Sequence, residues 1–271
     1  MNLFAKLTKE KKAFERDGYV VIKGLLTQSE ATMLKYAVEN CEPMQKLKSQ
    51  AQERWATGRR AAFETIFVWN DVTGDDMFCK ATRRDALFSR LKTFFDDDVY
   101  LYHNKVTLKY PGVDGFRYHQ DYFYWYDMGN LYPDMATAQI ALDPCNKRNG
   151  CLSVIPGTHK LGRLNHTSLT QSADSGVDDE RLQEILKRFP VVDVELEMGD
   201  AVLFHANLLH GSGHNTSEEA RVTLLGCYNT KHNSPYRTSC GHPYYSNQKS
   251  LNAEISESDL KLMPNFDLMY E

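Results

Sequence analysis

The chain has 271 residues, of which 42% are hydrophobic and 25% are charged. This composition is ordinary for a globular protein and excludes collagen-like, low-complexity and wholly disordered chains. The formal net charge is −4, from 32 basic and 36 acidic residues, which argues against a nucleic-acid or anionic-membrane partner. The length allows one large or two small domains, and we expect a single domain over residues 1–271.

The six cysteines are scattered and form no C-x-x-C pair, so we expect reduced, mostly buried thiols. No apolar run typical of a signal peptide follows Met1, and no apolar stretch is long enough to cross a bilayer. The sequence therefore predicts a cytoplasmic protein with no membrane partner. It leaves the oligomeric state open.

The first part of the chain carries helical patterns around one short strand. Helices are predicted over Thr8–Arg16, Thr27–Glu42 and Asp85–Phe95, the second of which opens with the capping box Thr-Gln-Ser-Glu. The β-branched run Tyr19–Ile22 predicts a strand. The polar stretch Met44–Gly58 indicates a surface loop or lid.

From Val99 onward, short runs of aromatic and β-branched residues alternate with Gly, Pro and Asn, a pattern typical of strands. The predicted strands are Val99–Tyr110, Arg117–Asp121, Ala136–Leu142, Cys151–Ile155, Val191–Leu196, Ala201–His205 and Arg221–Tyr228. Ser172–Arg188 is predicted to insert a polar loop, a second lid candidate, and a helix. Many short strands after a helical start predict a mainly β fold with flanking helices around a jelly-roll or barrel core.

His119 and Asp121 lie two residues apart on a predicted strand, so alternation would place both side chains on one face. His210, which follows the Met198-Gly199-Asp200 turn and a strand, is the candidate third ligand. Two imidazoles and one carboxylate form the facial triad of non-haem iron(II) oxygenases, which leaves coordination positions open.

In 2-oxoglutarate enzymes the keto acid takes two open positions, and its distal carboxylate needs a cation. Arginine suits this task because its planar fork makes two parallel hydrogen bonds to a carboxylate. Arg221 lies 11 residues after His210 and opens the last long predicted strand. Ser212 is a candidate for a second contact with the same carboxylate.

In these residues and in the motifs around them, the sequence resembles the phytanoyl-CoA dioxygenase family over about residues 13–230. The motifs that carry the resemblance are Phe14-Glu-Arg-Asp-Gly-Tyr-Val-Val21, His119-x-Asp121, Asn149-Gly-Cys-Leu-Ser-Val-Ile-Pro-Gly-Thr-His-Lys160, Met198-Gly-Asp200, His210-Gly-Ser212 and Arg221. The resemblance implies a double-stranded β-helix (jelly-roll, cupin-like) core. It also implies iron(II), with 2-oxoglutarate and O2 as cosubstrates.

The same resemblance implies a role for each matching position. His119, Asp121 and His210 become the catalytic iron ligands, and Arg221 and Ser212 hold the distal carboxylate of 2-oxoglutarate. It also implies two further cosubstrate-binding positions: Thr107 on the strand before the triad, and Gln139, where many members have tryptophan or serine.

Alternation along one predicted strand puts His103, Lys105, Thr107 and Lys109 on a common face. His103 and Lys105 are candidates to meet the substrate, with a solvated strand face as the alternative. Trp125, six residues after His119, is a candidate aromatic pocket residue by resemblance to the ectoine enzyme.

The region around Trp125 resembles family members that act on small polar or zwitterionic molecules. An aromatic wall suits an ammonium group, and Lys105, Arg59 or Arg60 suits an anionic end. The most specific hypothesis is hydroxylation of 2-aminoethylphosphonate to 2-amino-1-hydroxyethylphosphonate, a step of phosphonate catabolism. The alternatives are a hydroxylase of ectoine, an amino acid or an acyl-CoA, a non-catalytic 2-oxoglutarate- or metal-binding sensor, and a zinc or iron hydrolase.

The histidines also permit a different metal site. His205, His210 and His214 offer ligands for zinc, since the last two have H-x-x-x-H spacing. Gly211 and Gly213 disfavour the helix that this spacing requires. The retained Asp121 disfavours a halogenase, in which the carboxylate ligand is replaced.

Overall fold

The computed structural model describes residues 3–40, 65–69, 72–168, 175–237, 248–261 and 267–268. The predicted loop Met44–Gly58, Arg59 and Arg60, and residues 172–174 of the second predicted lid lie outside the described residues. Within these ranges no helix has the length and apolar character needed to cross a membrane.

The described residues form six α-helices and four 3-10 turns. They are α1 (Leu3–Asp17), α2 (Gln28–Asn40), α4 (Met77–Thr82), α5 (Asp85–Phe95), α6 (Asp121–Asp127) and α7 (Asp179–Leu186), with short 3-10 turns η1 (Lys147–Asn149), η2 (Thr158–Leu161), η3 (Lys231–Asn233) and η4 (Glu257–Lys261). The capping box that opens α2 is confirmed: Glu30 N donates to Thr27 Oγ1 at 3.2 Å, and Thr27 N donates to Glu30 Oε2 at 2.9 Å. The predictions of α1, α5 and the helix in the later insertion, α7, are also confirmed. Helices α4 and α6 were not predicted.

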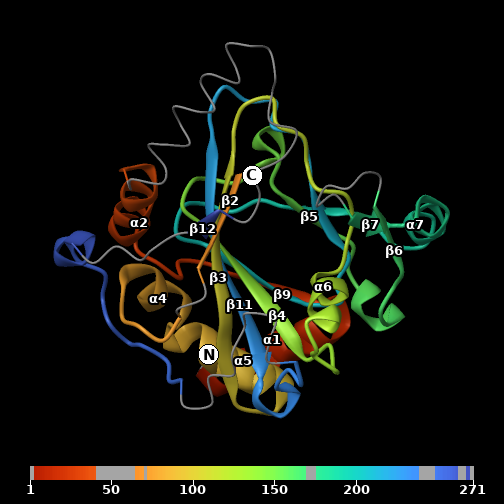
Figure 1. The fold of residues 1–271 in the computed structure, drawn as a ribbon, viewed down its shortest axis with the longest axis horizontal. Coiled ribbons are helices and arrows are strands. Elements are labelled where there is room, and N and C mark those ends of the chain that lie inside the picture. The colour runs from red at the N-terminus through yellow and green to blue at the C-terminus, as the bar shows by residue number, and fades with distance from the viewer. Residues whose placement is uncertain are drawn as a thin grey trace.

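The strands form two facing antiparallel sheets and a small ribbon (Figure 1). The larger sheet has the order β1 (Tyr19–Ile22), β9 (Ala201–His205), β4 (Met135–Ala141), β11 (Arg221–Thr230), β3 (Val99–Lys109), β2 (Thr65–Trp69) and β12 (Asp267–Leu268). The second sheet has the order β10 (His210–Ser212), β5 (Leu152–Val154), β8 (Val192–Val194), and the ribbon pairs β6 (His166–Ser168) with β7 (Ser175–Val177).

The predicted strand Arg117–Asp121 is wrong. This segment is irregular up to Gln120, apart from one isolated bridge at His119, and Asp121 is already the first residue of α6. Tyr122 to Tyr126 belong to the same helix, so their side chains do not alternate between two faces of a sheet. The other predicted strands correspond to β1, β3, β4, β5, β8, β9 and β11, with small differences at their ends.

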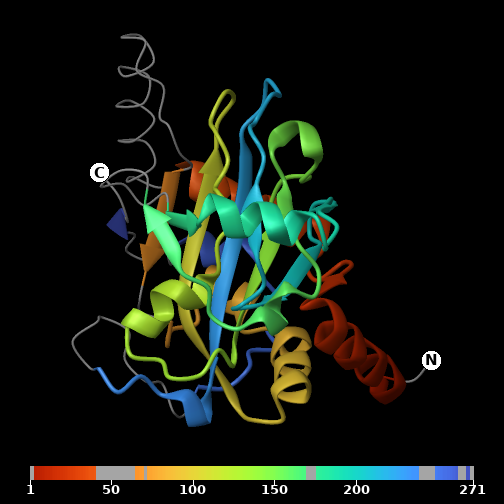
Figure 2. The same cartoon turned by 90° about the vertical axis from the view of Figure 1, so that its right-hand side faces the viewer.

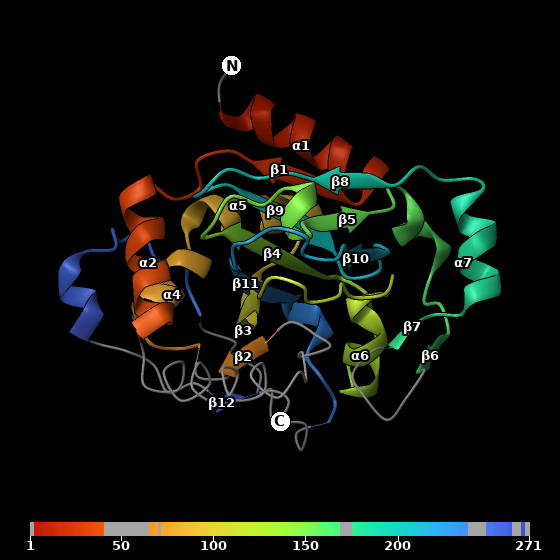
Figure 3. The same ribbon diagram turned by 90° about the horizontal axis from the view of Figure 1, so that it is seen from above.

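The larger sheet separates two cores. One face is apolar through residues such as Val106, Leu108 and Leu224, and it shares a buried cluster with Leu34 of α2 and Leu91 of α5. Figure 3 shows α2 and α7 at opposite ends of the molecule, and α1 along the edge where β1 lies.

The other face of the larger sheet meets the second sheet. Val202 and Phe204 of β9 are buried in one cluster with Leu152 and Val154 of β5 and Val194 of β8. Figure 2, turned by 90°, shows α7 and the short strands in front of the long strands β3 and β11. Two sheets packed face to face with helices outside form the predicted jelly-roll fold.

The Met198-Gly199-Asp200 motif proves to be a structural turn. Gly199 has φ +88°, and a Cβ there would lie 2.4 Å from the carbonyl oxygen of Leu26, so only glycine fits. The Asp200 carboxylate accepts hydrogen bonds from Gly24 N at 2.9 Å and Glu197 N at 3.0 Å. The turn thereby fixes the start of β9, the strand that leads towards His210.

Candidate active site

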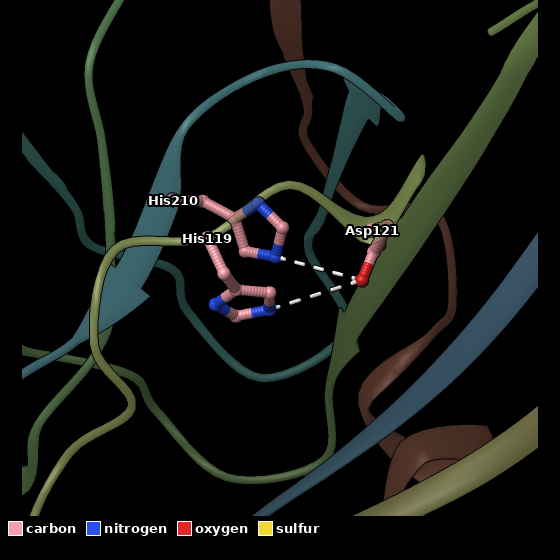
Figure 4. Close-up of side chains that lie close together, drawn as sticks. All are labelled: His119, Asp121 and His210. Atoms are coloured by element: carbon pink, nitrogen blue, oxygen red, sulfur yellow. Dashed lines mark ion pairs between the residues drawn. The ribbon is translucent and has the colours of Figure 1, made fainter. Parts of the chain in front are cut away.

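Three side chains that can hold a metal ion converge between the sheets. One ligand atom each from His119, Asp121 and His210 lies within 4.8 Å of the others. The Nε2 atoms of His119 and His210 lie 3.9 Å and 3.8 Å from Asp121 Oδ1. Figure 4 shows both imidazole rings presenting Nε2 to this oxygen. Among the described residues, this is the single group of three or more such ligands.

The triad assembles in a different way from the predicted one. His119 and Asp121 do not share a strand face; Gln120 between them is extended, with φ −114° and ψ 129°, and Asp121 begins α6. A carboxylate in the first turn of a helix is favoured by the helix dipole. The backbone of His119 meets that of His210 through His119 N to His210 O at 2.9 Å and His210 N to His119 O at 3.1 Å.

Hydrogen bonds fix the orientation of all three ligands. His119 Nδ1 donates to Arg117 O at 2.8 Å, and His210 Nδ1 donates to Leu208 O at 2.9 Å. Because Nδ1 carries the proton in each ring, the Nε2 lone pair is available to a metal. Thr137 Oγ1 of β4 donates to Asp121 Oδ2 at 2.7 Å, which leaves Oδ1 directed at the histidines.

The protonation states also suit a divalent cation. Burial, followed by the proximity of His210, lowers the pKa of His119 to about 4. Burial also lowers the pKa of His210. For Asp121, burial opposes ionisation, yet the charge of Lys105, the two histidines and the Thr137 hydrogen bond hold its pKa at about 2. At neutral pH the site therefore offers two neutral imidazoles and one carboxylate, a donor set that fits iron(II).

Gln120 connects the segments that carry the ligands. Its side chain is fully buried. Gln120 Nε2 donates to Gly162 O and Asn207 O, both at 2.8 Å, and Oε1 accepts from Leu164 N at 2.8 Å. Since Asn207 precedes the Leu208 carbonyl that orients His210, Gln120 positions both halves of the triad.

The inner face of the larger sheet carries a polar row beside the triad. Residues directly opposite in an antiparallel pair share a face, and Lys109, Thr107, Lys105 and His103 of β3 lie opposite Arg221, Thr223, Leu225 and Cys227 of β11. Gln139 of β4 lies opposite Leu225 on this face. The predicted common face of β3 is therefore present, and it lies between the sheets rather than in solvent.

Two of the predicted cosubstrate residues lie within this row. Thr107 Oγ1 makes a buried hydrogen bond with Thr223 Oγ1 at 2.8 Å. Gln139 is 5% exposed, and its Nε2 has no hydrogen-bond partner among the described residues. A buried amide that lacks an acceptor costs about 1–3 kcal/mol, so this donor suits a polar ligand between the sheets.

Trp125 lies in α6 within a buried aromatic cluster that includes Tyr100, Tyr102 and Tyr122. Its ring centroid is 6.1 Å from that of His103 and 6.2 Å from that of Tyr102. The cluster therefore meets the polar row at His103.

The alternative zinc site is not assembled. His214 pairs with Asp114 at 2.8 Å at the surface. The ring of His205 instead contacts Phe14, Phe95 and His159. The ring of His159 contacts that of His205, on the face of the larger sheet opposite to the triad.

Sequence reasoning missed Thr137 and Gln120. Thr137 could have been found, because alternation along β4 places it two residues before Gln139 on the same face. Gln120 gave no such signal: its contacts depend on segments far along the chain.

Comparisons with known proteins agree with this geometry. Residues 14–223 match the family described as phytanoyl-CoA dioxygenase. The chain is 26% identical over 251 residues to L-proline trans-4-hydroxylase of Streptomyces griseoviridis, covering 87% of this chain and 91% of the relative. It is 26% identical over 238 residues to ectoine dioxygenase of Streptomyces coelicolor, with 82% and 77% covered. It is 25% identical over 236 residues to 2-aminoethylphosphonate dioxygenase of uncultured bacterium HF130_AEPn_1, with 82% and 81% covered.

Solved structures show the same fold. EctD from S. alaskensis with 2-oxoglutarate and 5-hydroxyectoine superposes with a TM-score of 0.65 at 21% identity, covering 91% of this chain and 86% of that one. The epimerase SnoN with Fe3+, alpha ketoglutarate and nogalamycin RO gives a TM-score of 0.62 at 20% identity, with 87% and 88% covered.

Proposed function

The chain belongs to the phytanoyl-CoA dioxygenase family and is a 2-oxoglutarate-dependent dioxygenase, and from this premise we propose that it hydroxylates a small zwitterionic molecule. The overall reaction consumes the substrate, 2-oxoglutarate and O2 and yields the hydroxylated product, succinate and CO2. The observation that carries the proposal is that Lys105 shares the inner face of β3 with His103, whose ring centroid lies 6.1 Å from that of Trp125, so a cation and an aromatic cluster both lie near the metal ligands.

Bound iron(II) supplies the activation of O2 that the side chains cannot provide. The chain's own residues hold the ion and keep it accessible: His119 and His210 through Nε2, and Asp121 through Oδ1. Thr137 and the two backbone carbonyls that accept from Nδ1 fix these ligands before the metal binds.

Arg221 and Ser212 are proposed to bind the distal carboxylate of 2-oxoglutarate. Arg221 is 2% exposed on the inner face of β11. A guanidinium group binds a carboxylate with two parallel charge-assisted hydrogen bonds. Gln139 Nε2, which has no hydrogen-bond partner in the described part of the chain, and the hydroxyl of Thr107 are proposed to contact the same molecule nearer the metal.

The proposed substrate pocket uses His103, Lys105 and Trp125. Lys105 is close enough to Asp121 to lower the pKa of its carboxyl group, so it can hold an anionic group near the metal. The aromatic cluster provides a wall for an ammonium group through cation–π attraction. Proline, ectoine and 2-aminoethylphosphonate appear in the names of three similar enzymes, and each compound carries a cationic nitrogen group and an anionic group.

We retain 2-aminoethylphosphonate as the most specific substrate proposal. Its phosphonate would face Lys105 and its ammonium group the aromatic cluster, which places the carbon between them towards the metal. The product would be 2-amino-1-hydroxyethylphosphonate, and the role would lie in phosphonate catabolism. A cytoplasmic location remains a prediction from the sequence.

Succinate formation tests the proposal. The enzyme is incubated with iron(II), 2-oxoglutarate and O2, and with 2-aminoethylphosphonate, ectoine, L-proline or an acyl-CoA in separate reactions. We expect a zwitterion to stimulate succinate formation and to gain one oxygen atom by mass spectrometry. Stimulation by acyl-CoA alone would overturn the substrate class, and stimulation by ectoine or proline without the phosphonate would overturn the specific substrate.

The competing proposals make different predictions. A sensor would bind 2-oxoglutarate but form no succinate with any of these compounds. A hydrolase would remain active without 2-oxoglutarate. Family membership and the complete triad favour the dioxygenase over both.

A further inference from the structure

Helix α6, which carries Trp125, ends in a hydrogen-bonded turn that leads directly to Asn130. Gly129 N donates to Tyr126 O at 3.0 Å, and Asn130 N donates to Trp125 O at 3.2 Å. These two bonds form a Schellman motif, in which a glycine takes the left-handed conformation, here Gly129 with φ +99°. The turn fixes where Asn130 stands relative to the end of the helix.

The side chain of Asn130 links this helix to the larger sheet. Its Nδ2 donates to Trp125 O and to Tyr102 OH of β3, both at 3.0 Å. An amide nitrogen has two hydrogens to donate, so these contacts use both of them. One side chain therefore sets the spacing between α6 and β3 where the rings of Trp125 and Tyr102 meet, with centroids 6.2 Å apart.

Two further asparagines hold Asn130 in this position. Asn229 Nδ2 of β11 donates to Asn130 Oδ1 and to Tyr100 OH, both at 2.8 Å. Asn233 Nδ2 donates to Asn229 Oδ1 at 2.9 Å, and Asn233 Oδ1 accepts from Tyr132 N at 2.9 Å. Both amide atoms of each asparagine thus have a partner, although the three residues are at most 2% exposed.

This network lies beside a cluster of buried aromatic residues, where polar groups are costly. Removing an amide from water has a free-energy cost that its hydrogen bonds offset, and apolar side chains could fill the same space. A fully satisfied buried network is rigid and specifies one arrangement of its surroundings. The arrangement specified here is that of the aromatic cluster, since the network contacts Tyr100, Tyr102 and the main chain of Trp125.

The same cluster borders the proposed substrate pocket. The ring centroid of Trp125 is 6.1 Å from that of His103, which shares the inner face of β3 with Lys105. Asn130 bonds the main chain of Trp125, so it holds the helix in place without competing with a ligand for the indole ring.

From these contacts we propose that Asn130 is a positioning residue that determines substrate specificity: it fixes the spacing between Trp125 and Tyr102, and with it the shape of the aromatic wall that the ammonium end of the substrate meets. The inference rests on the proposed function, since it takes this wall as part of the substrate pocket. A wall that is held before binding loses little conformational freedom when the ligand arrives, so affinity depends on how well its shape fits the cationic group.

Turnover measurements separate this role from a general structural one. Asn130→Leu removes both donated bonds with little change in volume. The KM is measured separately for 2-oxoglutarate and for the zwitterion that stimulates the wild type most among 2-aminoethylphosphonate, ectoine and L-proline. The ratio of hydroxylated product to succinate is measured as well, because a misplaced substrate is hydroxylated less often for each 2-oxoglutarate consumed.

Asn104→Leu is the matched control. Asn104 is also 0% exposed and lies on β3, but its amide contacts Cys79 of α4, on the other face of the sheet. The substitution is the same and the burial is the same, while the aromatic wall is untouched.

We expect Asn130→Leu to raise the KM for the zwitterion about 10-fold or more, since small displacements of a positioning group have large effects, and to lower the ratio of product to succinate. The KM for 2-oxoglutarate should stay close to the wild-type value, and Asn104→Leu should match the wild type in all three quantities. An equal rise in both KM values, an unchanged KM for the zwitterion or an unchanged ratio would each overturn the role of Asn130.

A second variant serves if Asn130→Leu does not fold. Tyr102→Phe removes the other end of one bond by a single oxygen atom and keeps the ring, so a shift of both quantities in the same direction is expected, and its absence would overturn the proposal. If no zwitterion stimulates the wild type, the proposed function fails and this inference fails with it. The inference fails alone if the wild type is stimulated and the variant equals it in KM and ratio.

Discussion

The main chains of His119 and His210 exchange two hydrogen bonds, of 2.9 Å and 3.1 Å, although 90 residues separate them. This isolated bridge places two imidazoles side by side, with ring centroids 4.2 Å apart. Because the bridge uses backbone atoms, the position of the two segments does not depend on the imidazole rings.

We therefore expect His210→Ala and Asp121→Ala to fold and to lose metal-dependent succinate formation. Saturating Mn(II) should raise the Tm of the wild type, because a ligand that binds the folded state stabilises it, and should leave the Tm of both variants unchanged. Thermal unfolding with and without Mn(II) measures this. His214→Ala changes an exposed histidine paired with Asp114 and should behave as the wild type. Persistent activity in Asp121→Ala would contradict the site assignment.

Thr137 should tune metal affinity through Asp121. Thr137→Val keeps the shape but removes the 2.7 Å hydrogen bond to Asp121 Oδ2, and loss of such a supporting bond typically weakens metal binding by about 10–100-fold. Calorimetric titration with Mn(II) checks this. Thr137→Ser keeps the hydroxyl and should retain most of the affinity. Equal Mn(II) affinity in the valine and wild-type proteins would show that the bond does not orient the ligand.

Gln120 should contribute to stability as well as to the site. Gln120→Leu leaves Gly162 O, Asn207 O and Leu164 N without their buried partner, and each unsatisfied group costs about 1–3 kcal/mol. We expect a Tm lower by several degrees and weaker Mn(II) binding. Gln183→Leu, on the exposed side of α7, is the control. A Gln120 variant with unchanged Tm would refute this role.

His232 should make stability depend on pH. Its ring contacts Asp97 at 2.8 Å and Asp134 at 3.0 Å. The hydrogen bond to Asp97 is the main cause that raises the pKa of His232. The pKa of Asp97 is lowered, because hydrogen bonds from His232 outweigh the opposing effect of burial.

A raised histidine pKa gives stability that is full below the unfolded value of about 6.5 and is lost as pH rises through the folded pKa. The lowered pKa of Asp97 gives stability that is lost as pH falls through its folded value. His232→Gln should therefore reduce stability to urea most near pH 5.5 and little near pH 9. An equal loss at both pH values would mean that charge is not the cause.

Much of the fold was predictable because its signals are local. The capping box of α2, the β-branched run of β1 and the alternation of β3 each depend on neighbouring residues, and all three are confirmed. The order along the chain of the motifs that carry the resemblance, from Phe14–Val21 to Arg221, predicted one family, which the match over residues 14–223 confirms.

The errors arose where distant contacts determine the structure. The segment before Asp121 has strand-like composition, yet its backbone is held by isolated hydrogen bonds with His210, His166 and Val177 rather than by a neighbouring strand along its length. The short strand β10 is defined by pairing with β5 and has only three residues. Neither arrangement has a signature within a window of nearby residues.

The division of the larger sheet into an apolar outer face and a polar inner face also bears on how such enzymes diversify. Successive residues of β3 point to opposite faces of the sheet. Val106 and Leu108 pack against the helices, while Lys105, Thr107 and Lys109 face the space between the sheets. A lineage can therefore exchange alternate residues of these strands and acquire a new substrate while the helix-facing residues, and with them the fold, are inherited unchanged.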